Sequence, residues 1–133
     1  MSDINDRLRS TAYRGEIEFF IEQVSPERAT ARMPVTAGIL NPFGTVHAGA
    51  ILWFADVTAT RLALGDARLG AEGQGFPLAI DLHATLIGNV REGELRAEAT
   101  FVRKGKRVTV VRTKVTDGAD RTLLEVTTTH IPA

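Results

Sequence analysis

Residues 41–60 read NPFGTVHAGAILWFADVTAT, and this stretch decides how the rest of the chain is interpreted. The stretch opens on a turn at Asn41-Pro42. The residues from His47 to Leu64, which begin within it and continue past its end, are typical of a long helix. Asp56 is the only acidic residue of that helix. A helix that is apolar on nearly every side is a buried helix, and an aspartate within it must be paired, protonated or functional.

The segments before this helix have the alternation of half-buried strands. Residues 16–22 and 29–35 alternate apolar and polar positions, which predicts two strands. A short helix is expected over residues 3–13, with Ser2 or Asp3 as its cap. Residues 38–44 are expected to form the loop that leads into the long helix, which Gly65-Asp66 ends.

The segments after the helix predict four more strands, over residues 76–86, 95–101, 108–116 and 122–131. The first of them has its apolar residues at every second position, so we expect one face to carry Phe76, Leu78, Ile80, Leu82, Ala84 and Leu86. Short turns separate the four strands, and short turns join antiparallel neighbours. The pattern therefore predicts a four-strand meander.

Together these elements predict a single α+β domain over residues 1–133, with a curled antiparallel sheet wrapped around the long central helix. On a helical wheel one side of this helix carries Gly49, Leu52, Trp53, Asp56, Ala59, Thr60 and Ala63. A single sheet covers only part of an apolar helix, so we expect a second subunit to cover the rest. Asp56 would then lie near or at a subunit interface.

Composition excludes several classes of function. The chain has 133 residues, 16 basic and 16 acidic residues, and no cysteine. The neutral balance argues against a nucleic-acid-binding protein, and the lack of cysteine rules out disulfides, thiolate metal sites and cysteine nucleophiles.

The polar N-terminus is unlike a secretory signal, and the apolar runs are too short to span a bilayer. We expect a cytoplasmic protein with no membrane partner.

The loop and the helix start, residues 41–50, followed by Asp56, resemble the PaaI-like acyl-CoA thioesterases of the hot-dog fold superfamily. That family has an N-x-x-G-x-x-H-G-G loop and a helix aspartate nine residues after the histidine, the spacing of His47 and Asp56 here. The order of elements also matches over residues 14–131. The family's first glycine after the histidine is replaced by Ala48, whose N–H is retained but whose methyl group would narrow the pocket or shift the acyl preference.

The resemblance implies a catalytic role for Asp56, Asn41, His47 and Ala48. The N–H groups of Ala48 and Gly49 would bind the thioester oxygen, because the first turn of a helix has free donors and a partial positive charge. Asp56 would act as a general base on water or as a nucleophile, Asn41 would position the water or the carbonyl, and His47 would organise the loop. In the family the loop of one subunit faces the aspartate of the other, which implies a homodimer or homotetramer with shared sites.

Substrate contacts are expected at Gly49, which allows close approach, and at Trp53, which is either plain core or the wall of an acyl or aryl pocket. Four basic residues cluster at one predicted turn, and they either form a solvated hairpin or bind the phosphates of CoA. These residues are Arg103, Lys104, Lys106 and Arg107.

The remaining features suggest no other cofactor. His83 and His130 are interpreted as sheet residues, and the three histidines lack metal-site spacing, so no metal is expected. The segment from Gly70 to Phe76 is either a lid or a simple connection. The sequence therefore predicts hydrolysis of an aryl- or medium-chain acyl-CoA thioester, with no cofactor besides the CoA of the substrate. The alternative is a non-catalytic acyl-CoA-binding hot-dog protein.

Overall fold

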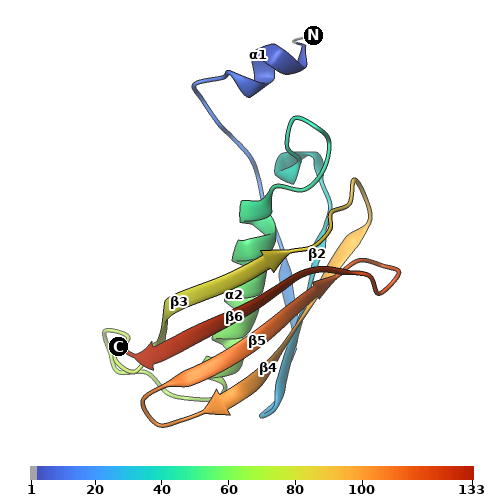
Figure 1. Cartoon of the computed structure of the whole chain (residues 1–133). Coiled ribbons are helices and arrows are strands. Elements are labelled where there is room, and N and C mark those ends of the chain that lie inside the picture. Colours follow the sequence, from blue (N-terminus) through green and yellow to red (C-terminus); the bar gives the residue numbers. More distant parts are fainter. Residues whose placement is uncertain (1–2) are drawn as a thin grey trace.

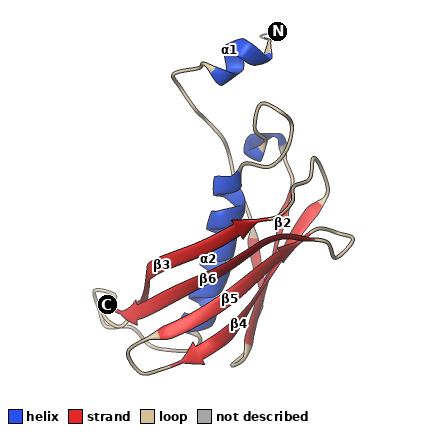
Figure 2. Ribbon diagram, viewed as in Figure 1, coloured by secondary structure: helices blue, strands red, loops and turns tan. Residues whose placement is uncertain are grey.

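A computed structural model describes residues 3–133, in which one helix lies against one face of a six-stranded antiparallel sheet (Figures 1 and 2). The helices are α1 (Ile4–Leu8), a short 3-10 helix (Ala37–Ile39) and α2 (Ala48–Leu64). The strands are β1 (Phe20–Val24), β2 (Arg28–Pro34), β3 (Pro77–Leu86), β4 (Glu94–Lys104), β5 (Thr109–Thr116) and β6 (Thr122–Pro132). This is the hot-dog fold that the sequence predicted.

The helix boundaries follow local chemistry. α2 begins after His47 and ends at Gly65, whose φ of 52° is one that glycine adopts readily and whose N–H donates to the Arg61 carbonyl oxygen at 3.0 Å. α1 is much shorter than the expected helix over residues 3–13, and Asp3 caps it by accepting a hydrogen bond from the Asp6 N–H at 2.9 Å. Ser2, the other candidate cap, lies outside the described residues.

The sheet order is β1-β2-β4-β5-β6-β3, so the expectation of a four-strand meander was wrong. Only β4, β5 and β6 form a meander; β3 pairs with β6, and β4 pairs with β2. The segment between β3 and β4, residues 87–93, is therefore a crossover between the edge and the interior of the sheet. The short-turn argument failed there because the glycine and charged residues of this segment look like those of a hairpin turn.

The core forms between α2 and the concave face of the sheet. From α2 it takes Ile51, Phe54, Ala55, Ala59 and Leu62, and from the strands it takes alternate residues such as Met33, Leu95, Val111 and Val126. The expected first strand is displaced: β1 starts at Phe20, while Ile17 and Phe19 precede it and still pack on the core. The predicted alternation of half-buried Ile17, Phe19 and Ile21 with exposed glutamates is confirmed.

A bulge between Ala79 and Asp81 changes the faces of β3. Leu82 pairs with Thr128 and lies on the concave face with it, whereas Leu78 pairs with Ile131 on the convex face. The prediction that all apolar residues of this strand share one face was therefore wrong. An extra residue in one strand shifts the alternation, and a period-two pattern in the sequence does not reveal it.

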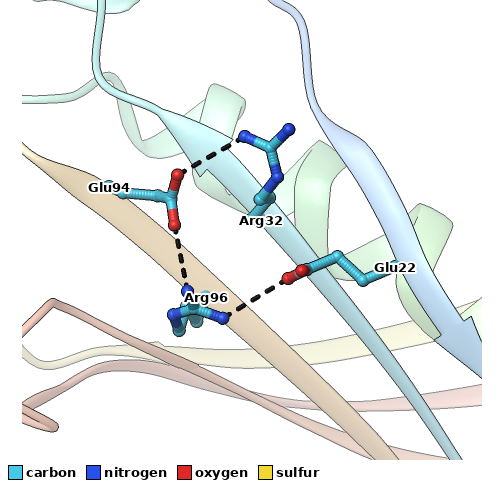
Figure 3. Close-up of polar contacts among 4 residues, drawn as sticks. All are labelled: Glu22, Arg32, Glu94 and Arg96. Atoms are coloured by element: carbon cyan, nitrogen blue, oxygen red, sulfur yellow. Dashed lines mark hydrogen bonds and ion pairs between the residues drawn. The ribbon is translucent and has the colours of Figure 1, made fainter.

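The two edges of the sheet differ in chemistry. β1 is short and bulged between Ile21 and Gln23, and one ion pair joins it to a network on the convex face of β2 and β4. Arg96 contacts Glu22 at 3.4 Å and Glu94 at 3.3 Å, and Arg32 contacts Glu94 at 3.4 Å (Figure 3). These pairs are exposed, so each contributes little to stability, but they keep this edge and face hydrated.

β3 forms the opposite edge, and it is long and apolar. It has ten residues, and the large apolar side chains exposed on it and just after it are Leu78, Ile80, Leu82, Leu86 and Ile87. A long apolar edge strand offers unpaired backbone groups and apolar surface together, a combination that proteins usually cover.

Candidate active site

The loop before α2 is held by the side chain of Asn41. Its carbonyl oxygen accepts hydrogen bonds from the N–H groups of Phe43, at 2.9 Å, and Thr45, at 3.1 Å, and its amide donates to the Thr45 hydroxyl at 2.7 Å. Gly44 follows with a φ of 83°, which closes the turn. In the structure Asn41 therefore shapes the loop, and one amide hydrogen remains for the water or carbonyl that the resemblance assigns to it.

Two residues that the sequence analysis missed fix this loop to the sheet. The Asn89 side chain accepts a hydrogen bond from the Val46 N–H at 3.1 Å and donates to the Val46 carbonyl at 2.7 Å. The Arg91 guanidinium donates to the Phe43 carbonyl at 2.6 Å. Both belong to the crossover after β3, and only knowledge of the sheet order would have brought this segment beside the loop.

His47 occupies the N-cap position of α2, but its side chain makes no capping hydrogen bond. Its backbone instead holds the loop in place between the 3-10 helix and α2. The His47 N–H donates to the Ile39 carbonyl at 2.8 Å, and the His47 carbonyl accepts from the Ala50 N–H at 3.1 Å. The imidazole is exposed at the mouth of the loop. These backbone bonds are compatible with the organising role that the resemblance implies.

Ala48 and Gly49 form the start of the first turn of α2, and both are exposed. The first N–H groups of a helix have no partner within it and point along the axis toward the N-terminus, where the helix dipole is positive. A Cβ added to Gly49 would meet nothing within 4 Å. The helix therefore offers two free donors beside open space, the arrangement that a developing oxyanion requires.

Asp56 lies two turns further along the helix, half-buried on its open side. One of its carboxylate oxygens is buried and has no hydrogen-bond partner among the described residues. Burial raises the pKa of the Asp56 carboxyl above its ordinary value, and the electrostatic influence of His130 lowers it again in part. Such a carboxyl is a stronger base than an exposed one.

His130 is a residue of the sheet, as expected. It is buried on β6, its Nδ1 lies 3.1 Å from the Pro77 carbonyl oxygen, and its Nε2 lies 2.8 Å from the Thr128 hydroxyl. The carbonyl can only accept, so Nδ1 carries a proton. His130 also lowers the pKa of Asp56 in part, against the larger effect of burial.

Trp53 is half-exposed on the same side of α2 and stacks edge-on against Phe19, with ring centroids 5.2 Å apart. It lines an apolar pocket at the helix start together with Gly49 and Ile39. Its contact with an acyl or aryl group stays a prediction.

The basic turn lies at the other end of α2 from the loop. Arg103, Lys104, Lys106 and Arg107 are all exposed, and Lys104 borders a hollow with residues 62–67 at the helix C-terminus. Seventeen residues of helix span about 25 Å, so one chain does not bring the basic turn to its own loop. Figure 1 shows the β4–β5 turn and the loop at opposite ends of the molecule.

Residues 70–76 fold into turns that are tied to the chain terminus. The Gly70 N–H donates to the Gln74 carbonyl at 2.9 Å, and the Gly75 N–H donates to the Ala133 carbonyl at 2.8 Å. Within the protomer this segment is an anchored connection at the end of the sheet, rather than a lid over the loop.

Two further findings concern residues 3–133. No three His, Asp or Glu side chains gather closely enough there to hold a metal ion. None of the helices is both long and apolar enough to cross a bilayer.

Comparison with known proteins gives the same fold. A profile of the thioesterase superfamily matches residues 43–124, which include α2 and most of the sheet. A variant of the hypothetical protein SAV0944 from Staphylococcus aureus superposes with a TM-score of 0.80 at 20% identity, over 86% of this chain and 93% of that one. Thioesterase HI1161 from Haemophilus influenzae gives a TM-score of 0.77 at 19% identity, over 86% and 78%.

A third structure was solved with coenzyme A. It is a hypothetical thioesterase protein from Streptococcus pneumoniae, with a TM-score of 0.75 at 14% identity, over 87% of this chain and 89% of that one. The TM-scores show that the fold is shared, and identities this low say nothing about the ligand of this chain.

Proposed function

This chain belongs to the thioesterase superfamily, and from that premise we propose that it hydrolyses an acyl-CoA thioester to a free carboxylic acid and CoA. The observation that carries the proposal is that α2 holds both chemical parts: two free helix donors, at Ala48 and Gly49, and the half-buried Asp56, one of whose oxygens has no partner among the described residues. Hydrolysis of a thioester needs both parts, an oxyanion site and a base or nucleophile.

In the proposed reaction the thioester carbonyl oxygen accepts hydrogen bonds from the N–H groups of Ala48 and Gly49. The Asp56 carboxylate takes a proton from water as the water oxygen bonds to the carbonyl carbon. The tetrahedral intermediate then breaks the C–S bond, and the CoA thiolate leaves and takes up a proton. Attack by the carboxylate itself, through a mixed anhydride that water hydrolyses, is the other route open to Asp56.

The distance along the helix supports a site shared between two chains. Asp56 is eight residues after Ala48, which is about 12 Å along the axis, and a carboxylate must come within hydrogen-bond reach of the water that attacks the carbonyl. The base for one helix start is therefore expected from another copy. We propose that this copy pairs along β3, the long apolar edge of the sheet.

A two-fold axis perpendicular to the sheet at β3 would join two sheets through antiparallel edge strands. It would cover the apolar side chains of β3 and place the two α2 helices side by side, running in opposite directions. The start of each helix would then face the body of the other, where Asp56 lies. The same operation would bring the partner's basic turn toward the loop, where it could hold the CoA phosphates.

The proposal is tested by measuring thiol release from a panel of acyl-CoA thioesters, with Asp56→Ala and Asp56→Asn beside the wild type. We expect turnover by the wild type and a loss of about 10²- to 10⁴-fold in kcat in both variants, the usual contribution of a general base. If both variants keep the kcat of the wild type, the proposed role of Asp56 is refuted. Binding of CoA esters with no turnover of any of them would favour the non-catalytic acyl-CoA-binding protein.

A single-turnover reaction in ¹⁸O-labelled water separates the two roles of Asp56. A general base delivers the labelled oxygen directly to the product acid, so the first product carries label. A nucleophile first gives one of its own unlabelled carboxylate oxygens to the acyl group. When water then attacks the Asp56 carbon of the anhydride, the first product acid is unlabelled and the label stays on Asp56.

A further inference from the structure

The two residues that precede α2 are held by the backbone on both sides. On one side the His47 N–H donates to the Ile39 carbonyl at 2.8 Å, and Val46 forms an isolated antiparallel bridge with Leu40. On the other side the Val46 N–H donates to the Val90 carbonyl at 3.3 Å. The side chain of Val46 is fully buried in the core. The chain therefore enters the helix from one defined position.

The side chain of Asn89 adds a second contact to Val46, and this contact has two hydrogen bonds. The amide oxygen accepts from the Val46 N–H at 3.1 Å, and the amide nitrogen donates to the Val46 carbonyl at 2.7 Å. Two residues of antiparallel strands exchange N–H and C=O bonds in the same way. One hydrogen bond leaves a peptide group free to rotate, whereas a pair of bonds to one planar amide fixes the peptide groups on both sides of Val46.

The backbone that carries Asn89 is itself anchored to β6 and to the turn before it. The N–H groups of Ile87 and Gly88 donate to the Leu123 carbonyl at 2.8 and 3.1 Å. The Arg121 guanidinium donates to the Asn89 carbonyl at 3.4 Å. Asn89 is thus presented to the loop from the sheet, and a side chain on a supported element positions its partner more precisely than one on a free loop.

Val46 lies two residues before the first proposed oxyanion donor. The N–H of Ala48 belongs to the peptide group that follows His47, and the His47 carbonyl on the same group accepts from the Ala50 N–H at 3.1 Å. The N–H of Gly49 belongs to the next peptide group. Oxyanion donors act because they are aimed before the reaction starts, and a displacement of about 1 Å can cost about 100-fold in rate. A residue that orients Val46 therefore bears on the reaction.

Stability alone gives little reason for the contact between Asn89 and Val46. Asn89 is exposed, and the Val46 N–H also donates to the Val90 carbonyl. Water can replace the hydrogen bond of an exposed side chain, so the net contribution of such a bond to stability is small. Water does not replace the fixed angle between the two groups of the amide. The contact therefore orients the backbone more than it stabilises the fold.

We infer that Asn89 is a positioning residue of the reaction, which aims the N–H groups of Ala48 and Gly49 by holding the backbone of Val46. It acts through the loop and contacts none of the reacting atoms. The inference rests on the proposed function and adds to it a residue outside the loop and the helix. Aimed donors bind the developing oxyanion more strongly than the ground-state carbonyl, so the loss of Asn89 lowers kcat and leaves KM nearly unchanged.

The kinetic test compares Asn89→Asp and Asn89→Ala with the wild type. An aspartate keeps the size and the acceptor, but its carboxylate has no hydrogen for the Val46 carbonyl and repels it. Both variants should lower kcat by about 10- to 100-fold, which is less than the loss of a donor itself, and change KM less than about threefold. Asn5→Asp is the matched control, since the exposed Asn5 side chain on α1 also makes a side-chain hydrogen bond, with Arg9. It should change neither value.

The second readout is the infrared band of a bound thioester whose carbonyl carbon is ¹³C. It is recorded in Asp56→Asn, in which the thioester survives the measurement. Hydrogen bonds from Ala48 and Gly49 should lower the carbonyl frequency relative to the free thioester. Adding Asn89→Asp or Asn89→Ala should move the band back toward the free value, and adding Asn5→Asp should leave it in place. A merely structural role would change the amount of folded protein and leave the band unmoved.

The outcomes distinguish the positioning role from the proposed function. If the Asn89 variants keep the wild-type kcat, or lose activity with an unmoved band, the positioning role is refuted and the thioesterase stands. If the wild type binds thioesters and hydrolyses none, the proposed function fails, and the movement of the band still decides whether Asn89 aims the donors. If the band of the bound thioester equals that of the free one even with Asn89 intact, the helix start is not an oxyanion site and both proposals are refuted.

Discussion

At the scale of single residues, the feature that matters most is the environment of Asp56. Its neighbours on the helix are apolar, and one of its oxygens is buried without a partner among the described residues; burial raises its pKa and the buried His130 lowers it in part. The sequence alone raised the question of this carboxylate. It could not reveal the influence of His130, which lies on the last strand, far from Asp56 in the sequence.

The first prediction concerns the pH dependence of activity. A general base must be ionised to act, and burial raises the pKa of Asp56. We therefore expect kcat/KM to rise with pH, with an apparent pKa above that of an exposed aspartate. His130 lowers this pKa, so His130→Gln should move the acidic limb of the profile to higher pH. A merely structural role for His130 would lower activity at every pH and leave the limb in place.

The second prediction concerns stability. The pKa of Asp56 is raised in the folded state, so folding favours its protonated form. The stabilising contribution is full below the unfolded pKa and is lost as the pH rises through the folded pKa. The asparagine of Asp56→Asn is uncharged at every pH. This variant should therefore have a higher Tm than the wild type at neutral pH and the same Tm at acidic pH. Asp6→Asn, on the exposed α1, is the matched control for the substitution itself.

At the scale of elements, the sequence predicted the long helix well and the sheet order poorly. The helix residues His47–Leu64 and the strands have strong local patterns, and both ends of the helix were placed to within a residue. Sheet order depends on contacts between distant segments, such as β2 with β4 and β3 with β6, and local patterns do not encode them. For the same reason the loop anchors Asn89 and Arg91 could not be foreseen, whereas the loop and helix motif could.

The third prediction concerns the edge strand β3. Leu82→Lys places a charge on the proposed interface, so it should reduce the assembly to single chains in sedimentation experiments and lower kcat with it. Leu8→Lys is the matched control, since Leu8 is 44% exposed and Leu82 is 42% exposed, and Leu8 lies on α1, away from this edge. A Leu82→Lys protein that keeps both its mass and its activity would show that β3 is not the interface.

At the scale of the whole molecule, charge is distributed unevenly in a nearly neutral chain. Glu16 and Glu18 lie near the helix start, the basic turn of residues 103–107 lies at the far end, and the convex face carries paired charges (Figure 3). A polyanionic CoA would therefore bind to one end of each chain and the acyl group to the other. Only an assembly of two chains in opposite directions joins these ends into one site.

The fourth prediction follows from this distribution. Replacing Lys104 and Lys106 by glutamate should raise KM for a CoA thioester by about tenfold, as expected when charge-assisted phosphate contacts are lost. The effect should shrink at high salt, and it should be absent with an N-acetylcysteamine thioester, which has no phosphate. Lys114→Glu, on the convex face of β5, is the control. Equal losses with both thioesters would contradict a phosphate-binding role.

The most direct test of the account is to restore activity by mixing two inactive variants. Asp56→Ala lacks the base, and Gly49→Leu blocks the oxyanion site with a side chain that the open space can accept. Each alone should be inactive. If each site combines the loop of one chain with Asp56 of its partner, mixed dimers contain one intact site, and random assembly should recover about a quarter of wild-type activity. If mixed dimers form and no activity returns, both parts of the site belong to a single chain, and the proposal that two chains share each site is refuted.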